Sequence, residues 1–171
     1  VSSHDSELPE EYQSNNGFYN YDHLSSVVFC VNTDLEAELG IEINSFADLL
    51  NPALNGKVII SDPTSSSAAW NNLSNIFAVY GNDSDEAWAQ IEGMLQNGLI
   101  VVGSSSACFK SVQQGEYVVG LTYEDGASTL LKDGATNIKM VYPSEGSSAF
   151  AFAAAIVKNA PHMDAAKAMI E

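Results

Sequence analysis

The sequence predicts a three-layer α/β/α fold, in which helices cover both faces of a central sheet. Short apolar runs rich in Val and Ile alternate along the chain with segments whose apolar residues recur at helical spacing. The strand-like runs are almost continuously apolar, which is typical of strands buried on both faces. The chain has 171 residues, of which 46% are hydrophobic and 16% charged, so it is long and apolar enough to bury a core.

The N-terminal part predicts a polar segment that leads into the folded body. Residues 1–25 are polar and irregular, and three tyrosines in them can pack this arm onto a body: Tyr12, Tyr19 and Tyr21. The β-branched run 26–31 then predicts the first strand.

Two helix starts follow this strand. Thr33 predicts an N-cap, and Glu36 is placed to reach back and complete a capping box. Ser45 with Asp48 three residues later predicts a short helix through residue 50, which stops at the Asn-Pro pair 51–52.

The middle of the chain predicts one strand and two longer helices. Residues 57–61 predict the strand, 67–80 a helix, and 85–96 a second helix. The expected buried side chains of these helices are Trp70, Leu73, Ile76, Phe77, Tyr80, Trp88, Ile91 and Leu95.

The same alternation continues to the end of the chain. Further strands are predicted at 99–102, 117–123, 138–142 and 150–157. A helix after residue 106 carries Phe109 and Val112 and has Gly115 as its C-cap; another spans 126–133, and a last one begins at Asp164. We found no repeat of fixed period.

The charge of the chain excludes some partners. Six Lys and no Arg stand against 22 Asp and Glu, a formal net charge of −16. Phosphate backbones and anionic lipid surfaces are bound mainly through Lys and Arg, so we expect neither a nucleic-acid partner nor binding to anionic lipid surfaces. Because no apolar run is long enough to span a membrane, we also expect no direct membrane insertion. No secretory signal precedes the fold, so we expect that a signal, if there is one, has been removed. The last helix has no stop signal, and we expect the chain to be a piece of something longer.

The two cysteines lie in apolar segments without the spacing of a metal site or a disulfide framework. Cys30 and Cys108 therefore predict small core residues. Two alternatives remain at this stage. They are a single disulfide, and a reactive thiol at Cys108 near the predicted start of a helix.

Polar segments directly follow three predicted strands. Thr64, Ser65 and Ser66 follow the strand 57–61, and Ser104, Ser105 and Ser106 follow 99–102. Ligands of open α/β sheets bind beyond the carboxyl ends of the strands, where hydroxyls and the free amides of helix N-termini favour a phosphoryl or carboxylate group. Ordinary helix capping explains such serines equally well, so both interpretations stand.

The strand 117–123 ends in Tyr123, Glu124 and Asp125, an aromatic surface with two carboxylates. This combination can hold sugar hydroxyls, an amine or a hard metal ion, whereas a role in the turn and helix start is the structural alternative. A second candidate loop contains Tyr142, Ser144, Glu145 and Gly146, for which a plain turn is the alternative.

An enzyme receives little support. The histidines His4, His23 and His162 lie in polar segments, where we expect solvated surface side chains, and none shares a motif with a serine cluster. Gly103–Ala107 lacks the second glycine of a nucleophile elbow, and there is no zinc or phosphate-loop motif. We therefore predict no catalytic residue, no bound metal and no cofactor. A serine hydrolase using one of Ser104 to Ser106 is the alternative of another class.

Six segments in a fixed order resemble the extracellular solute-binding proteins of ABC importers. They are VVFCVNTDL (27–35), SFADLLNP (45–52), GKVIISDP (56–63), VQQGEY (112–117), VYPSEG (141–146) and AIVKNA (155–160). The resemblance covers about residues 17–171 and is closest to the ferric, phosphonate and sugar-phosphate branch of the two-lobed type II periplasmic-binding fold.

This resemblance implies the organisation of the chain. Two lobes of such proteins close on a solute, and hinge strands join them. The chain would be mainly the second lobe: a polar segment at 1–25, a ligand-binding lobe with two hinge strands at 26–158, and at 159–171 the start of a helix of the other lobe.

It also implies the function. The protein would be periplasmic or extracellular (a surface lipoprotein in a Gram-positive host), monomeric at full length and non-enzymatic, and would deliver a small polar solute to an ABC permease in the membrane. Ferric binders of the family show two adjacent tyrosines where this chain has Tyr123 and Glu124. A phosphorylated or phosphonate-type anion therefore fits better, held by the residues named above: Thr64, Ser65, Ser66, Ser104, Ser105, Ser106, Tyr123, Glu124 and Asp125. Ferric ion, thiamine and a polyamine are the alternatives, and so is a sensor module of the same fold.

Overall fold

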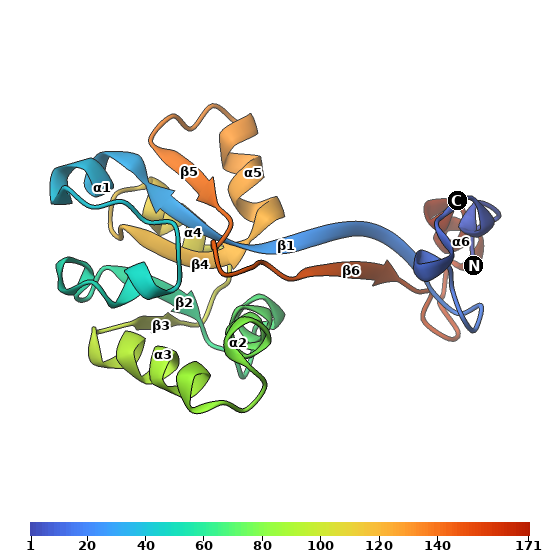
Figure 1. The fold of residues 1–171 in the computed structure, drawn as a ribbon. Coiled ribbons are helices and arrows are strands. Elements are labelled where there is room, and N and C mark those ends of the chain that lie inside the picture. Colours follow the sequence, from blue (N-terminus) through green and yellow to red (C-terminus); the bar gives the residue numbers. More distant parts are fainter. The chain divides into compact units, whose positions relative to one another are not determined.

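The structure, a computed structural model, describes residues 1–171, and the chain divides into two compact units (Figure 1). The larger unit is Ser26–Ser148. The smaller one combines Val1–Ser25 with Ala149–Glu171.

The larger unit is built on a mixed sheet with the strand order β3-β2-β4-β1-β5. β2 (Val58–Ser61) pairs in parallel with β3 (Ile100–Val102) and β4 (Val119–Tyr123). β1 (Asn20–Asn32) runs antiparallel to both β4 and β5 (Ile138–Val141). Four strands therefore point the same way, and their carboxyl ends lie at one edge of the sheet.

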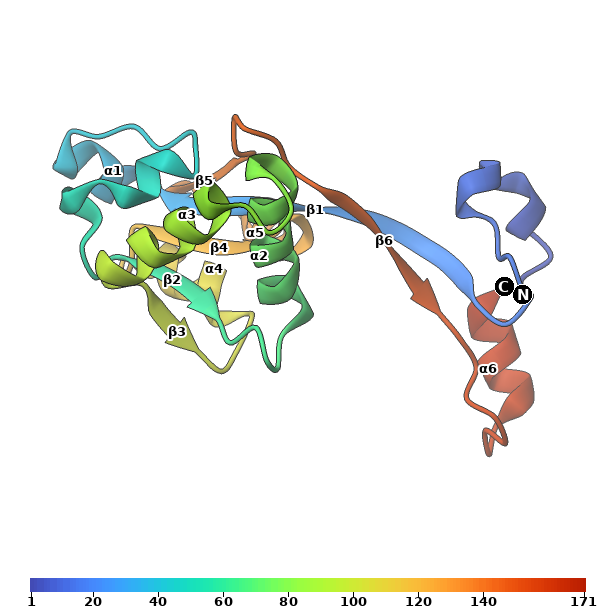
Figure 2. The ribbon, with the colours of Figure 1, turned by 60° about the horizontal axis from the view of Figure 1, so that its bottom comes forward.

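Helices cover both faces of this sheet, as the sequence predicts (Figure 2). α2 (Ser67–Tyr80) and α3 (Asp85–Gln96) lie on one face with the short 3-10 helices η3 (Ala47–Leu50) and η4 (Pro52–Leu54). α4 (Ala107–Gln113) and α5 (Glu124–Lys132) lie on the other. α1 (Thr33–Leu39) contacts β5. Each face has its own apolar cluster, the first around Phe29, Phe46 and Leu121, the second around Cys30, Ile59 and Phe109.

α4 packs so closely on β4 that one position must be glycine. A Cβ atom at Gly120 would collide with the carbonyl of Cys108, and Val112 lies close by. Gly126 likewise leaves room for the ring of Phe109. Both glycines are buried in the second apolar cluster, where even one methyl group disturbs the packing.

The start of α1 differs from the capping box predicted by the sequence. Asn32, one residue earlier than expected, caps the helix: its side-chain oxygen accepts from the amides of Asp34 at 3.1 Å and Leu35 at 3.0 Å. Glu36 instead accepts from the amide of Ile43 at 2.8 Å and pairs with Lys139 at 2.8 Å. The cap is therefore an asparagine, and the glutamate is used in tertiary contacts.

The bounds predicted for α2 and α3 are confirmed, but three side chains expected to be buried are exposed. Trp70 is 62% exposed, Trp88 53% and Leu95 55%. The buried positions include Asn72, Asn75 and Gln90. These amides donate to backbone carbonyls far away in the chain, at Thr122, Gly146 and Phe46. Because distant backbone carbonyls accept from these side-chain N–H groups, the helices turn a partly polar face inward.

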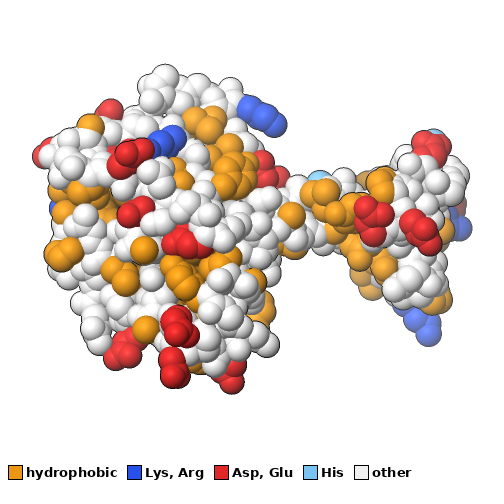
Figure 3. Space-filling view, in the orientation of Figure 1, with side chains coloured by type: hydrophobic (Ala, Val, Ile, Leu, Met, Phe, Trp, Pro, Cys, Tyr) orange, Lys and Arg blue, Asp and Glu red, His pale blue; other side chains and the backbone are white.

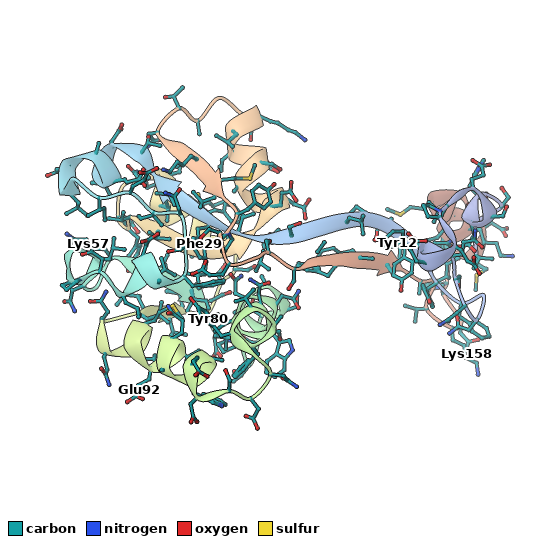
Figure 4. All side chains as sticks on the ribbon, in the orientation of Figure 1. Tyr12, Phe29, Lys57, Tyr80, Glu92 and Lys158 are labelled. Atoms are coloured by element: carbon teal, nitrogen blue, oxygen red, sulfur yellow. The ribbon has the colours of Figure 1, made fainter.

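The smaller unit contains η1 (Asp5–Glu7), η2 (Glu10–Tyr12), β6 (Ala149–Ala154) and α6 (Met163–Ile170). β6 pairs with the first half of β1, which starts at Asn20 rather than at residue 26 as predicted. The N-terminal tyrosines contact one another, with ring centroids 6.2 Å apart for Tyr12 and Tyr21 and 5.2 Å for Tyr19 and Tyr21 (Figure 4 labels Tyr12). Residues 20–25 and 149–154 form the connecting strands of this unit. The two hinge strands expected within residues 26–158 stay a prediction.

Candidate functional site

The polar segments predicted from the sequence lie together at the carboxyl edge of the sheet. Ser61 at the end of β2 pairs with Val102 at the end of β3, and β4 ends beside them at Tyr123. β5 runs the same way as β4 and ends at Val141. This edge therefore carries all nine predicted site residues, as well as the loop after β5: Thr64, Ser65, Ser66, Ser104, Ser105, Ser106, Tyr123, Glu124 and Asp125.

The turn after β2 is organised by Asp62. Its carboxylate accepts from the amide of Thr64 at 2.8 Å and from the Thr64 hydroxyl at 2.7 Å, and these bonds hold the pKa of Asp62 below its usual value. Ser66 caps α2 by accepting from the amide of Ala69, and it also accepts from the Ser61 hydroxyl at 2.9 Å. Capping thus explains Ser66. Ser65 is exposed and its hydroxyl makes a single 3.4 Å bond to a backbone carbonyl.

The turn after β3 is organised differently, because its serines do not cap the next helix. Ser106 precedes α4 but makes no side-chain capping bond, and its hydroxyl lies 3.1 Å from that of Ser104. The carbonyls of Ser104 and Ser105 accept from the amides of Ala107 and Cys108. The hydroxyls of this turn are therefore not required for the helix start.

The end of β4 leads directly into α5. The ring of Tyr123 meets that of Phe109 edge to face at 6.0 Å, which fixes its orientation. Glu124 and Asp125 occupy the first turn of α5, a favourable place for carboxylates. Glu124 accepts a hydrogen bond from the phenol of Tyr142 at 2.7 Å.

Two further residues of this edge escape sequence reasoning. Asn72 on α2 donates to the carbonyls of Ala68 at 2.9 Å and Thr122 at 3.1 Å, while its own side-chain oxygen has no partner. The hydroxyl of Thr122 on β4 is also buried without a partner. The sequence carries one local signal for these residues: Asn72 occupies a position of α2 at which the helical periodicity predicts an apolar side chain.

The loop after β5 acts mainly as a structural clamp. Glu145 accepts from the amides of Phe46 at 3.1 Å and Ala47 at 3.2 Å, and from the phenol of Tyr80 at 2.9 Å. Burial and this carboxylate raise the pKa of Tyr80 to about 12. The turn interpretation of this loop therefore fits Ser144–Gly146, whereas Tyr142 points to Glu124.

The edge contains carboxylates but no lysine in the segments 61–67, 103–106, 122–125 and 142–146. Lys57 precedes β2 and lies at the opposite end of that strand (Figure 4). Acidic side chains are spread over the face of the molecule that Figure 3 shows. An anion bound at this edge would depend on amides and hydroxyls rather than on a cationic side chain.

Both cysteines are free and buried, which confirms the prediction of core residues. Burial raises the pKa of Cys30 to about 12 and that of Cys108 to about 11. The alternative of a reactive thiol at Cys108 is wrong, because the loss of solvation outweighs the neighbouring amide and hydroxyl bonds that lower its pKa. The structure contains no group of three or more His, Cys, Asp or Glu side chains placed to hold a metal ion. All three histidines are exposed, as predicted.

The larger unit has the mixed α/β fold of one lobe of the type II periplasmic binding proteins. The family model of bacterial extracellular solute-binding proteins matches residues 2–171. The chain therefore belongs to this extracellular or periplasmic family. None of its helices has the length and apolar character needed to span a bilayer.

Several known proteins are similar to the chain. An uncharacterized protein of Haemophilus influenzae is 26% identical over 151 residues, which make up 87% of this chain and 43% of that protein. A solved two-component system protein that mediates signal transduction is 28% identical, with a TM-score of 0.77 over 96% of this chain and 54% of its own. The periplasmic binding protein AfuA of Actinobacillus pleuropneumoniae, solved with fructose-6-phosphate, is 24% identical. Its TM-score is 0.83, over 99% of this chain and 54% of AfuA. The chain thus spans about half the length of these proteins.

Proposed function

We propose that the chain is the ligand-binding lobe of the solute-binding component of an ABC importer. It captures a small polar solute at the carboxyl edge of its sheet, within an interlobe cleft, and the closed protein delivers the solute to a membrane permease without covalent chemistry. The observation that carries this proposal is the convergence of four strand ends at one edge, each followed by polar residues. We expect the full-length protein to be monomeric.

The solute class that fits this edge is a phosphorylated or phosphonate-type organic anion. α2 has fourteen residues, and the amides of its first turn have no acceptor inside the helix; Ser66 caps that of Ala69, and the others favour an anion. The hydroxyls of Ser65, Ser104 and Ser105 are not used as helix caps and can donate to phosphoryl oxygens. Tyr123, Glu124 and Asp125 would then face the organic part of the solute. Ferric ion, thiamine and a polyamine are the competing ligands, because the same carboxylates favour a cation.

Amide shifts in ¹⁵N-labelled protein test this proposal even where binding is weak. We expect glucose 6-phosphate at millimolar concentration to shift the amides of residues 66–68 and 105–107, and glucose at the same concentration to leave them in place. Exchanging both Ser65 and Ser105 for Ala should weaken the effect, whereas Ser74→Ala, on the exposed side of α2, should not. Shifts caused by spermidine or ferric citrate alone would instead assign the edge to a cation.

A second function is favoured by one comparison. The similarity to a two-component system protein, at 28% identity, supports a ligand-sensing module built on the same fold. The chain would then report the bound solute to a signalling domain rather than to a permease. Co-purification of the full-length protein with its permease, or with a histidine kinase, distinguishes the two.

A further inference from the structure

Tyr142 and Glu124 come from different strands and meet at the carboxyl edge. Tyr142 directly follows β5, and Glu124 directly follows β4. Both strands pair with β1, one on each side, in registers that place Val27 opposite Tyr123 and Phe29 opposite Val141. The two side chains therefore reach across β1 near Val27, in the interior of that strand, and the phenol donates to one carboxylate oxygen at 2.7 Å.

This contact leaves Glu124 with unused capacity to accept. The phenol of Tyr142 has one proton to donate, and it is directed to Oε1 of Glu124. An ionised carboxylate has about four acceptor positions on two oxygens, so Oε2 can still accept a hydrogen bond. The pKa of Tyr142 is raised, first of all by this hydrogen bond, because ionisation would place a phenolate against a carboxylate.

The contact also fixes the direction of the carboxylate. Glu124 is the first residue of α5, where a free glutamate side chain can turn back toward the amides of its own helix or out into solvent. Immobilising such a side chain on binding costs free energy, and a side chain already held in place avoids that cost. Tyr142 is 46% exposed, so the pair lies where a solute can reach it.

We propose that Tyr142 is a positioning residue of the solute site: it holds Glu124 so that the second carboxylate oxygen accepts a hydrogen bond from a donor group of the solute, a hydroxyl or an ammonium. This inference rests on the proposed solute-binding function. It assigns the end of β5 to the site through Tyr142, although the rest of that loop is a structural clamp.

The first experiment tests the pair without any solute. With ¹³C label at Cζ of tyrosine, the ionisation of Tyr142 is followed by NMR. Glu124→Gln should lower the pKa of Tyr142 toward the ordinary tyrosine value, and Glu116→Gln, at an exposed site just before β4, should leave it unchanged. An unchanged pKa of Tyr142 in Glu124→Gln would overturn the inference at this step.

The second experiment tests the positioning role with three probes: inorganic phosphate, glucose 6-phosphate and spermidine. Tyr142→Phe removes only the phenol and should weaken glucose 6-phosphate about three- to tenfold, the effect of one lost hydrogen bond, and weaken phosphate far less. Tyr117→Phe serves as the matched control. Equal losses for both phosphates, or no loss for either, would contradict the inference.

The third probe separates this inference from the proposed function. If the wild-type protein binds spermidine but neither phosphate, the proposed anionic solute is wrong, and a loss of spermidine affinity in Tyr142→Phe still supports the positioning role. If none of the three binds to the full-length protein, both proposals fail, and a shifted pKa of Tyr142 shows only a structural pair.

Discussion

The thiols of Cys30 and Cys108 are buried on the same side of the sheet, and their ionisation is linked to folding. Their pKa values rise from 9.0 to about 12 and about 11 in the folded protein. Because the folded state holds these protons more tightly, their contribution to stability is complete below pH 9 and is lost as the pH rises toward 11 and 12. We expect the free energy of unfolding to fall steeply above pH 9, as measured by urea denaturation.

A variant with both cysteines exchanged for Ala provides the control for this prediction. It should be less stable than the wild type at neutral pH, because buried groups are lost, but its stability should fall less between pH 9 and 11. Tyr80 titrates in both proteins and so does not affect the comparison. Parallel curves for the two proteins would show that the thiols are not the cause.

Glu145 connects three parts of the larger unit through a single carboxylate. Glu145→Ala removes the acceptor of two backbone amides and of the Tyr80 phenol, and we expect a loss of about 1–3 kcal/mol in the free energy of unfolding. Glu42→Ala, at an exposed site, should change stability by less than about 0.5 kcal/mol. Urea denaturation of both variants measures the difference. Similar free energies of unfolding for the two variants would show that the contacts of Glu145 do not stabilise the fold.

At the scale of elements, the contact between α4 and β4 depends on Gly120. Gly120→Ala places a methyl group against the carbonyl of Cys108, so α4 must move away from the sheet, and we expect a loss of about 3 kcal/mol or more. Gly103→Ala is the matched control, because its Cβ meets no atom within 4 Å and its backbone is not left-handed. Thermal unfolding followed by circular dichroism compares the two variants. Equal unfolding midpoints would show that α4 can move away from β4 without a loss of stability.

The same elements show which structural information is local in the sequence. The bounds of α2 and α3 follow from their caps and glycine stops, which are neighbours in the chain. Their buried face does not, because Asn72, Asn75 and Gln90 find partners at Thr122, Gly146 and Phe46. In the candidate site, the position of the serines at strand ends could be predicted in the same local way. The pairing of Tyr142 with Glu124 could not, since it requires knowing that β1 lies between β4 and β5.

At the scale of the whole molecule, all residues of the two apolar clusters lie in Ser26–Ser148. The hydrogen bonds that Asn75 makes with Gly146 and Ser148 also lie within this range. Since both faces of the sheet are covered without residues 1–25 or 149–171, we expect residues 26–148 to fold alone as a cooperative unit.

Trp70 and Trp88 both belong to this unit, so their fluorescence reports its unfolding. In urea, the fragment 26–148 and the whole chain should unfold with similar midpoints. The fragment should also keep the near-ultraviolet circular dichroism of packed aromatic side chains. A broad transition without that signal would mean that the connecting strands contribute to the core, and that the carboxyl edge, with its serines and Glu124, is formed only when both units are present.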